Sequence, residues 1–472
     1  MSAHPTDVTG SLVDRSLPPA PGKVDSFGFP TVHSSVLANG LALRVACLPR
    51  LPLVAVALVL PAGESMLGDA HAGHAILAGD ALEGGTSART GSDLADALEG
   101  LGAALRVSVG WDATTVSLTS LADRWEKALA LLTEVVLQPA FPHDEVVRVR
   151  EQQLARLRQR AMDPVSLAND RSAELLHAPG VPYGRPARGT LASVRRFDPT
   201  AARTLASAHY RPRGAGLVVA GDVDPDWVTR VSANALAQWE GAPAAGRHFE
   251  VHPRFHEATV HVIDRPESVQ SEIRVGHTGV SMGHPDYHAL VVVNSVLGGA
   301  FTSRLNLSLR ERHGFTYGVR TGFAFRRRAG PFSTSTAVAT DVTAPAVREI
   351  VAELTQMAEA GPTEEEMEAT RDYLAGVFPL QLETTGQVAA RVAELIVYDL
   401  PDDHYRRYRD RVRSVSRDAA AAAARRHIRP AQLTVVVVGA ADQVVGPLEA
   451  LGIGPVAVHR RPPGEPAPGA PR

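Results

Sequence analysis

The sequence contains a single cysteine and almost no lysine. Cys47 is the only cysteine among the 472 residues, so no intrachain disulfide can form and an oxidising compartment is not required. Lys23 and Lys127 are the only lysines, and arginine carries the rest of the positive charge. The formal net charge of −3 gives no indication of binding to nucleic acid or to an anionic membrane.

Long hydrophobic runs are also missing. No apolar segment reaches the length of a membrane span. Residues 1–31 are rich in proline, glycine and serine and contain no continuous apolar stretch, so we expect a disordered arm and not a signal peptide. The proline-rich residues 459–472 are expected to be a disordered tail. We therefore expect a cytoplasmic bacterial protein, whose 44% hydrophobic content suits sizeable cores.

The order of apolar and polar residues predicts several elements. A strand pair with a proline-containing turn is expected between Ser34 and Leu60, and an amphipathic helix capped by Ser92 from 92 to 101. Further elements follow from the same patterns: strands at 105–109 and 114–118, and helices at about 123–137 and 144–162.

A repeat divides the chain into two similar parts. The segment HYRPRGAGLVVAGDV from His209 matches HIRPAQLTVVVVGAA from His427 at a constant offset of 218 residues. Each segment predicts a helix end, an arginine-proline turn and a buried strand. A match at one offset over several elements indicates a duplicated domain of about 210 residues.

We therefore expect two homologous halves, residues 32–240 and 256–458, joined by a linker at 241–255. In each half, apolar strands alternate with long helices. This pattern favours a mostly antiparallel sheet with helices packed on one face, an α/β (α+β) fold.

The segment GHAILAGDALEGGT, from Gly73 to Thr86, predicts a short helix closed by a glycine-threonine turn. It resembles the zinc-binding helix of the pitrilysin/insulinase peptidases, in which H-x-x-E-H precedes such a turn. Counted back from the turn, the two histidine positions are Ile76 and Asp80, and the glutamate position is Gly79. Isoleucine has no lone pair, glycine has no side chain, and one aspartate is a poor zinc site.

The family's third zinc ligand is a glutamate on a later helix. When REQQLARLRQ, from Arg150 to Gln159, is matched to that helix, Arg156 falls on the ligand and Val149 on a supporting acid. The resemblance thus implies that the zinc site has degenerated, and we expect no metal in this chain.

The other histidines do not have the spacing of a replacement zinc site. Pairs three or four residues apart lack a following acid or bracket a proline, which favours a turn. We interpret them as surface or capping residues: His71, His74, His256, His261, His284 and His288.

The second half retains a more specific motif. SRLNLSLRERHGFTYGV, from Ser303 to Val319, matches the family's S-R-L-x-x-x-L-R-E-x-x-G-x-x-Y segment at nearly every fixed position. The resemblance assigns Arg310 and Tyr317 to the arginine and tyrosine that reach the substrate across from the zinc. A guanidinium and a phenol can donate hydrogen bonds to a peptide carbonyl and to a developing oxyanion.

The glycine pair Gly298-Gly299 precedes this motif, and we include it in the substrate-binding segment. Ordinary roles remain open for each side chain alone. Arg310 could form a surface ion pair with Glu311, and Tyr317 could be a half-buried strand aromatic.

The resemblance covers nearly the whole chain between the two tails, and it is nearest to the short two-domain branch similar to mitochondrial processing peptidase. In heterodimers of that branch, one chain supplies the zinc and the other the arginine and tyrosine. The resemblance implies a non-catalytic subunit without autonomous activity, paired with a homologous zinc-bearing chain and acting on peptides. Two alternatives stay open: a structural or peptide-binding scaffold, and a self-sufficient metalloenzyme with an unconventional site.

Two charged features give further hypotheses. Asp80 and Arg156 carry opposite charges at former ligand positions, so a buried ion pair could replace the metal, since either charge alone would be uncompensated. The alternative is an Arg156 that points to solvent. The basic run from Phe325 to Arg328 is expected to be a solvated hairpin tip, or else a surface that attracts acidic peptides.

Overall fold

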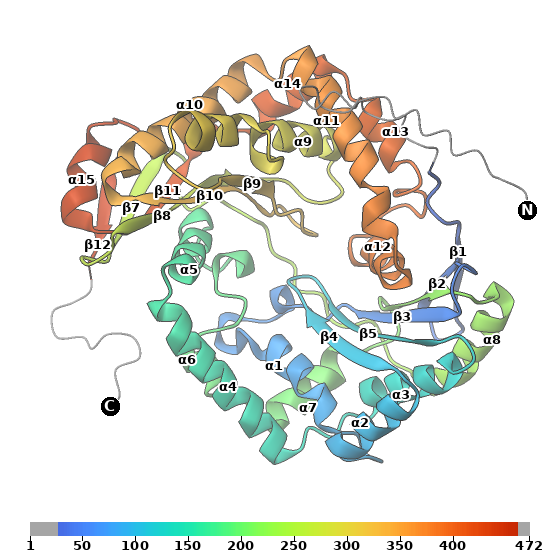
Figure 1. The fold of residues 1–472 in the computed structure, drawn as a ribbon. Coiled ribbons are helices and arrows are strands. Elements are labelled where there is room, and N and C mark those ends of the chain that lie inside the picture. Colours follow the sequence, from blue (N-terminus) through green and yellow to red (C-terminus); the bar gives the residue numbers. More distant parts are fainter. Residues whose placement is uncertain (1–26, 461–472) are drawn as a thin grey trace, which may run out of the picture.

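The structure is a computed structural model that describes residues 27–460. Residues 1–26 of the predicted arm and 461–472 of the predicted tail lie outside the described residues. The described chain forms two six-stranded sheets with helices packed on them, which confirms the predicted fold class (Figure 1). None of its helices is long and apolar enough to cross a membrane.

The first sheet has the strand order β1-β2-β6-β3-β5-β4. Neighbouring strands are antiparallel except β2 and β6, which are parallel. The strands are β1 (Val32–Val36), β2 (Ala42–Cys47), β3 (Leu53–Leu60), β4 (Ala104–Val109), β5 (Thr114–Leu121) and β6 (Gly216–Gly221). The segment in which a strand pair was expected thus contains three strands.

The second sheet has the order β12-β7-β11-β8-β10-β9. Strand β7 is parallel to β11 and to β12, and the other pairs are antiparallel. The strands are β7 (Thr259–Asp264), β8 (Gln270–Thr278), β9 (Arg320–Phe323), β10 (Pro331–Ala339), β11 (Thr434–Gly439) and β12 (Val456–His459).

Five strands of each sheet correspond in order and direction, as expected after a duplication. Helices α7 (Pro199–His209) and α14 (Arg417–His427) end at the two matched histidines, and β6 and β11 follow at the offset found in the sequence. The sixth strands differ. Strand β1 precedes the repeat and is antiparallel to its neighbour, whereas β12 follows it and is parallel.

The remaining helices of the first half are α1 (His74–Asp80), α2 (Gly91–Gly100), α3 (Trp125–Leu137), α4 (His143–Met162), α5 (Pro164–Leu176), α6 (Leu191–Val194) and α8 (Pro225–Ala235). Those of the second half are α9 (Tyr287–Asn294), α10 (Thr343–Ala360), α11 (Glu364–Val377), α12 (Thr385–Val397), α13 (Tyr408–Arg413) and α15 (Ala441–Glu449). Helix α2 is capped by Thr90 and not by Ser92, because the Thr90 hydroxyl accepts the backbone N–H of Asp93.

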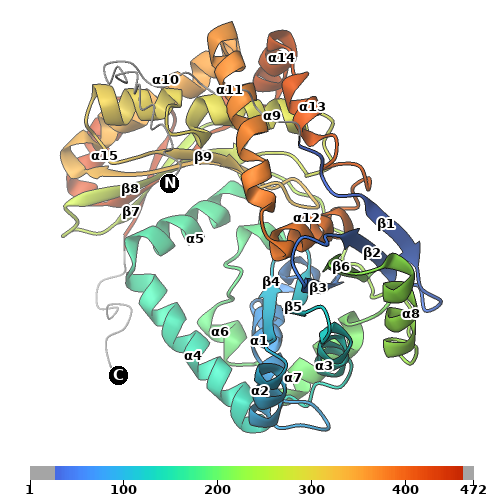
Figure 2. The ribbon, with the colours of Figure 1, turned by 45° about the vertical axis from the view of Figure 1, so that its right-hand side comes forward.

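The two halves exchange one helix each. Helix α12 of the second half packs on β3 and β6 of the first sheet, and α5 of the first half packs on β8 and β11 of the second sheet. Both helices lie on the inner faces of the sheets, between the two halves (Figures 1 and 2). The sequence division at residue 240 does not reveal this exchange.

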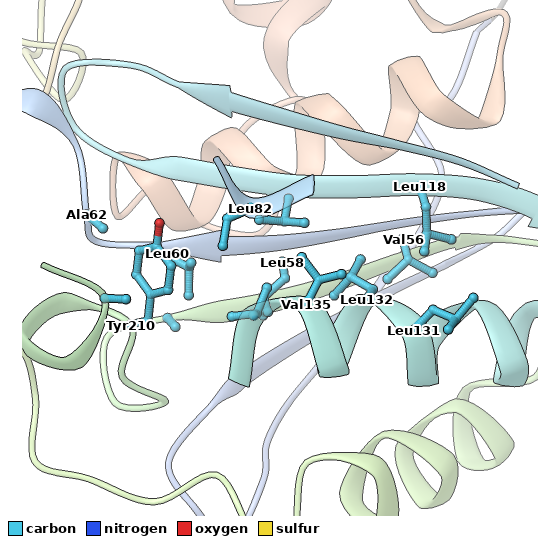
Figure 3. Packing of buried hydrophobic residues seen from close by; sticks show 14 of the residues in the cluster. Val56, Leu58, Leu60, Ala62, Leu82, Leu118, Leu131, Leu132, Val135 and Tyr210 are labelled. Carbon is cyan, nitrogen blue, oxygen red and sulfur yellow. The ribbon is translucent and has the colours of Figure 1, made fainter. Parts of the chain in front are cut away.

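The exchange explains why the central strands are apolar on both faces. One face of β3 places Val56, Leu58 and Leu60 in the core with Leu132 and other residues of α3 (Figure 3). The opposite face carries small residues that pack against α12. A strand covered on both faces reads as a continuous apolar run.

The last residues of the predicted arm are packed on the second half. Phe29 is 6% exposed and its ring lies 5.7 Å from that of Tyr405. The Phe27 ring contacts Phe378 at 6.3 Å. Phe27 and Phe29, which fall within the predicted arm, thus pack against aromatic rings of the second half. At the other end, His459 belongs to β12 and not to the tail.

Candidate functional site

Helix α1, which carries the degenerate zinc-site positions, is fixed at its N-terminus by a buried acid. It begins after Gly73, whose φ of 86° favours glycine. The Glu64 carboxylate accepts the backbone N–H groups of Gly73 and Ile76 at 2.9 and 3.0 Å. Burial raises the pKa of Glu64 to about 7, opposed by these hydrogen bonds and by Arg185.

The glutamate position of the resemblance is filled by neighbouring atoms. A Cβ at Gly79 would lie 2.6 Å from Cγ2 of Val109 and 3.2 Å from Cγ1 of Val107 on β4. Ile76 is 9% exposed. A glutamate side chain at this position therefore requires the side chain of Val109, or the strand that carries it, to move.

Asp80 and Arg156 do not form the expected ion pair. Both side chains are exposed, and no ion pair within 4.0 Å joins them in the described part of the chain. Arg156 lies on the exposed face of α4, while Val149 and Gln153 face inward. Desolvation raises the pKa of Asp80, and the longer-range fields of arginines including Arg188 and Arg156 lower it.

These residues do not fit a zinc ion. The four positions present an alkyl side chain, a hydrogen atom, one carboxylate and one guanidinium, whereas zinc is held by imidazole, thiolate and carboxylate groups. The site around α1 therefore offers no route to metal-dependent chemistry within this chain.

The glycine pair before the Arg/Tyr segment has a packing role. Helix α9 continues into a wide turn at Ser295–Gly299. A Cβ at Gly298 would lie 2.6 Å from Cγ2 of Thr321 and 3.0 Å from its backbone nitrogen. A Cβ at Gly299 would lie 2.7 Å from Nδ2 of Asn294. Gly298 thus lets the turn approach β9 closely, and Gly299 lets it lie against the end of α9.

Asn306 ties the loop that carries Tyr317 to the preceding helical turn. Its Nδ2 donates to the carbonyl of Val319 at 3.0 Å, and its Oδ1 accepts the N–H of the same residue at 3.1 Å. On the other side, the Thr336 hydroxyl of β10 contacts Thr316 Oγ1 at 2.9 Å and donates to the Gly318 carbonyl at 3.0 Å. These contacts hold the backbone on both sides of Tyr317.

Arg310 and Tyr317 are both accessible to solvent. Arg310 forms an ion pair with Glu311 at 3.2 Å, and its guanidinium carbon lies 4.0 Å from the centre of the Phe301 ring. Tyr317 is 100% exposed, so it is not a half-buried strand aromatic. Within residues 27–460, no hydrogen bond or ion pair joins either side chain to α1 or α4.

The basic run from Phe325 to Arg328 is solvated only in part, because Arg327 and Arg328 are exposed whereas Arg326 packs on two aromatic rings. The Arg326 guanidinium carbon lies 4.9 Å from the centre of the Trp111 ring and 4.3 Å from that of Tyr183. Asp112 accepts the Tyr183 hydroxyl at 2.8 Å and the N–H of Arg327 at 3.0 Å. Burial lowers the pKa of Arg326.

We call this contact, formed by Trp111, Asp112, Tyr183, Arg326 and Arg327, the latch. It joins the β9–β10 hairpin of the second half to the β4–β5 hairpin of the first half. Sequence reasoning missed it because its residues in the second half lie at least 143 positions from those in the first half, and no local pattern marks them.

Family models match a segment in each half of the chain. Residues 48–184 match the family described as Insulinase (Peptidase family M16), and residues 196–374 match Peptidase M16 inactive domain. The chain belongs to the M16 peptidase family. The predicted resemblance to the pitrilysin/insulinase peptidases is thereby confirmed.

Relatives and solved structures cover most of the chain. An uncharacterized zinc protease of Mycobacterium leprae is 25% identical over 76% of this chain and 81% of its own length. One of Bacillus subtilis is 22% identical over 65% and 74% of the two chains. A peptidase M16 inactive domain from Pseudomonas fluorescens superposes with a TM-score of 0.82 and 25% identity, over 86% of this chain and 97% of that one. A protease from Helicobacter pylori has the same fold, with a TM-score of 0.80 and 18% identity over 87% and 99%.

Proposed function

We propose that this protein is a non-catalytic subunit of a heterodimeric M16 peptidase. It pairs with a homologous chain that carries H-x-x-E-H and zinc, and it contributes Arg310 and Tyr317 in trans to the hydrolysis of peptides. The bacterial origin of the relatives supports a bacterial source, and a cytoplasmic location forms part of the same proposal.

The observation that carries the proposal is the contrast between the two motifs. At α1 the position of the catalytic glutamate is closed by Val107 and Val109 of β4. In the second half, Tyr317 is fully exposed on a loop whose backbone is held from both sides. An exposed phenol on an ordered loop is available to an external group, such as a peptide or a partner chain.

The edge of the first sheet supports a role in peptide binding. Strand β4 is the last strand on its side of the sheet, and it lies beside α1. Such an edge can pair with an extended peptide through main-chain hydrogen bonds. The peptide class is therefore an unstructured segment and not a folded protein.

Co-expression with a homologous chain that carries H-x-x-E-H tests the proposal. Wild type is expected to give peptide hydrolysis that neither chain gives alone. Arg310→Ala and Tyr317→Phe are each expected to lower kcat by about one to three orders of magnitude if the side chains stabilise the transition state.

Matched controls are available outside the motif. Arg348 is an exposed arginine of α10 and Tyr373 is a 53% exposed tyrosine of α11, so Arg348→Ala and Tyr373→Phe should leave kcat unchanged. Full activity in both Arg310→Ala and Tyr317→Phe would refute the role in trans.

A structural or peptide-binding scaffold is the second candidate. It is favoured by the contacts that Arg310 already makes with Glu311 and Phe301, which are those of an ordinary surface residue. This candidate predicts a stable complex in size-exclusion chromatography without any partner-dependent hydrolysis.

A further inference from the structure

A cluster of potential metal ligands lies away from both motifs. His284 and Asp286 precede α9, and His427 is the last residue of α14. The two helices pack against each other on the outer layer of the second half (Figure 1). One ligand atom from each side chain lies within 4.8 Å of the others, and this is the only such group of three in the described part of the chain.

The three side chains already contact one another. His427 Nε2 lies 2.8 Å from Oδ2 of Asp286, and the rings of His284 and His427 are 4.7 Å apart between centroids. The backbone N–H of Asp286 donates to Nδ1 of His284 at 3.1 Å.

The surroundings suit a metal that prefers nitrogen ligands. Arg426 donates to Oδ1 of Asp286 at 3.1 Å and approaches Oδ2 at 2.9 Å, so it orients the carboxylate from outside the cluster. Two imidazoles and one carboxylate favour zinc, nickel or copper over magnesium or calcium.

We propose that His284, Asp286 and His427 form a binding site for one divalent transition-metal ion, with zinc as its natural occupant. The ion replaces the proton between Nε2 of His427 and Oδ2 of Asp286. It also binds the lone pair on Nδ1 of His284, which otherwise accepts the backbone N–H of Asp286.

The role of this ion is structural. It joins the start of α9 to the end of α14, and α9 leads directly to the glycine turn before the Arg/Tyr segment. This proposal does not depend on the proposed peptidase role. It also means that zinc found in the purified chain does not identify a catalytic centre at α1.

Equilibrium dialysis of the tag-free, full-length chain tests the site. The protein is stripped with EDTA, dialysed against micromolar zinc chloride, and analysed for bound metal. We expect about one equivalent of zinc in wild type. His284→Ala and His427→Gln are each expected to weaken binding by more than about 10-fold, since even residues outside the ligand shell change metal affinity by that factor.

Three comparisons keep the result specific. His427→Gln retains a donor to Asp286 and so preserves the helix contact, which circular dichroism verifies. His256→Ala removes an exposed histidine outside the cluster and should leave binding unchanged, as should Asp80→Asn at the degenerate zinc position. Magnesium at 100-fold excess should not displace zinc. If wild type binds no zinc, or if His284→Ala and His427→Gln bind it as wild type does, the proposal is overturned.

Discussion

The guanidinium carbon of Arg326 lies 4.3 Å from the centre of the Tyr183 ring, although the two residues belong to opposite halves of the chain. Trp111 lies on the same guanidinium at 4.9 Å. The hairpin that carries Arg326 begins at Arg320, three residues after Tyr317. The latch therefore sets the position of the Tyr317 loop relative to the first sheet.

Loss of the latch should loosen the contact between the halves. Arg326→Ala removes a desolvated cation from two rings, each contact of this kind being worth about 2 kcal/mol. We expect a lower urea midpoint and faster proteolysis within the β9–β10 hairpin. Arg328→Ala changes an exposed neighbour in the same run and should behave as wild type. Equal proteolysis of the two variants would contradict the role of Arg326.

Restoring the zinc motif should fail without a change in β4. A variant with Ile76→His, Gly79→Glu, Asp80→His and Arg156→Glu carries all the family's ligands. The glutamate side chain introduced at position 79 would meet Val109, whose Cγ2 lies 2.6 Å from the position of a Cβ. Overpacking of this kind costs about 1–3 kcal/mol. We expect reduced stability and no zinc bound at α1.

Adding Val109→Ala to that variant tests whether Val109 causes the overpacking. Truncation opens the space beside α1, so stability and zinc binding should both recover. The same Val109→Ala change in wild type serves as the control and should only destabilise the protein. A second equivalent of zinc in the four-fold variant without Val109→Ala, beyond the one held by His284, Asp286 and His427, would show that β4 does not close the site.

The Asn306 amide should matter for activity although it is buried. Asn306→Ala removes both hydrogen bonds to Val319, at a cost of about 1–3 kcal/mol for the groups left unpaired. With the zinc-bearing partner, we expect kcat to fall while the affinity between the subunits stays unchanged. Ser308→Ala, which removes a 3.3 Å hydrogen bond on the same turn, provides a comparison. A kcat equal to that of wild type would show that Asn306 does not position Tyr317 for activity.

Buried histidines should make the protein sensitive to acid. Burial lowers the pKa of His277, His288 and His404 to about 4 each, against about 6.5 in an unfolded chain. Between these values the unfolded state binds more protons, so the free energy of unfolding falls as the pH is lowered from 6.5 towards 4. Above pH 6.5 these residues contribute no pH dependence.

Urea unfolding at pH 7.5, 5.5 and 4.5 measures this dependence. His404→Phe keeps an aromatic ring in the cluster with His288 and Tyr405 and removes one titrating group. Its stability should therefore change less with pH, by up to about 1.4 kcal/mol per pH unit. Exposed His256→Ala should keep the slope of wild type. An unchanged slope in His404→Phe would contradict the assignment.

The sequence predicted the parts of the fold that depend on local patterns. The match between His209 and His427 correctly predicted two equivalent helix ends followed by buried strands, because a duplication leaves both pattern and spacing intact. Apolar patterns located helices α1 to α4, and the family motif located the Arg/Tyr segment. Hydrophobic periodicity reports which side chains are buried, so it predicts a helix or strand well where the local pattern alone determines the buried face.

What the sequence could not show are contacts between distant segments. Asp80 and Arg156 have complementary charges, but the rotation of α4 directs Arg156 to solvent, and that rotation is set by the packing of Val149 and Gln153. Arginine at position 326 reads as surface charge until Trp111 and Tyr183 are brought beside it. His284 and His427 are 143 positions apart, so spacing rules for metal ligands could not pair them.

The exchanged helices α5 and α12 determine whether one half of the chain can fold without the other. Each sheet would be left with one hydrophobic face open to water if its half were made alone. An ancestral half could satisfy that face only by lending its helix to an identical molecule, as in a swapped dimer. Cleavage within residues 241–255 should therefore leave two fragments that remain bound to each other.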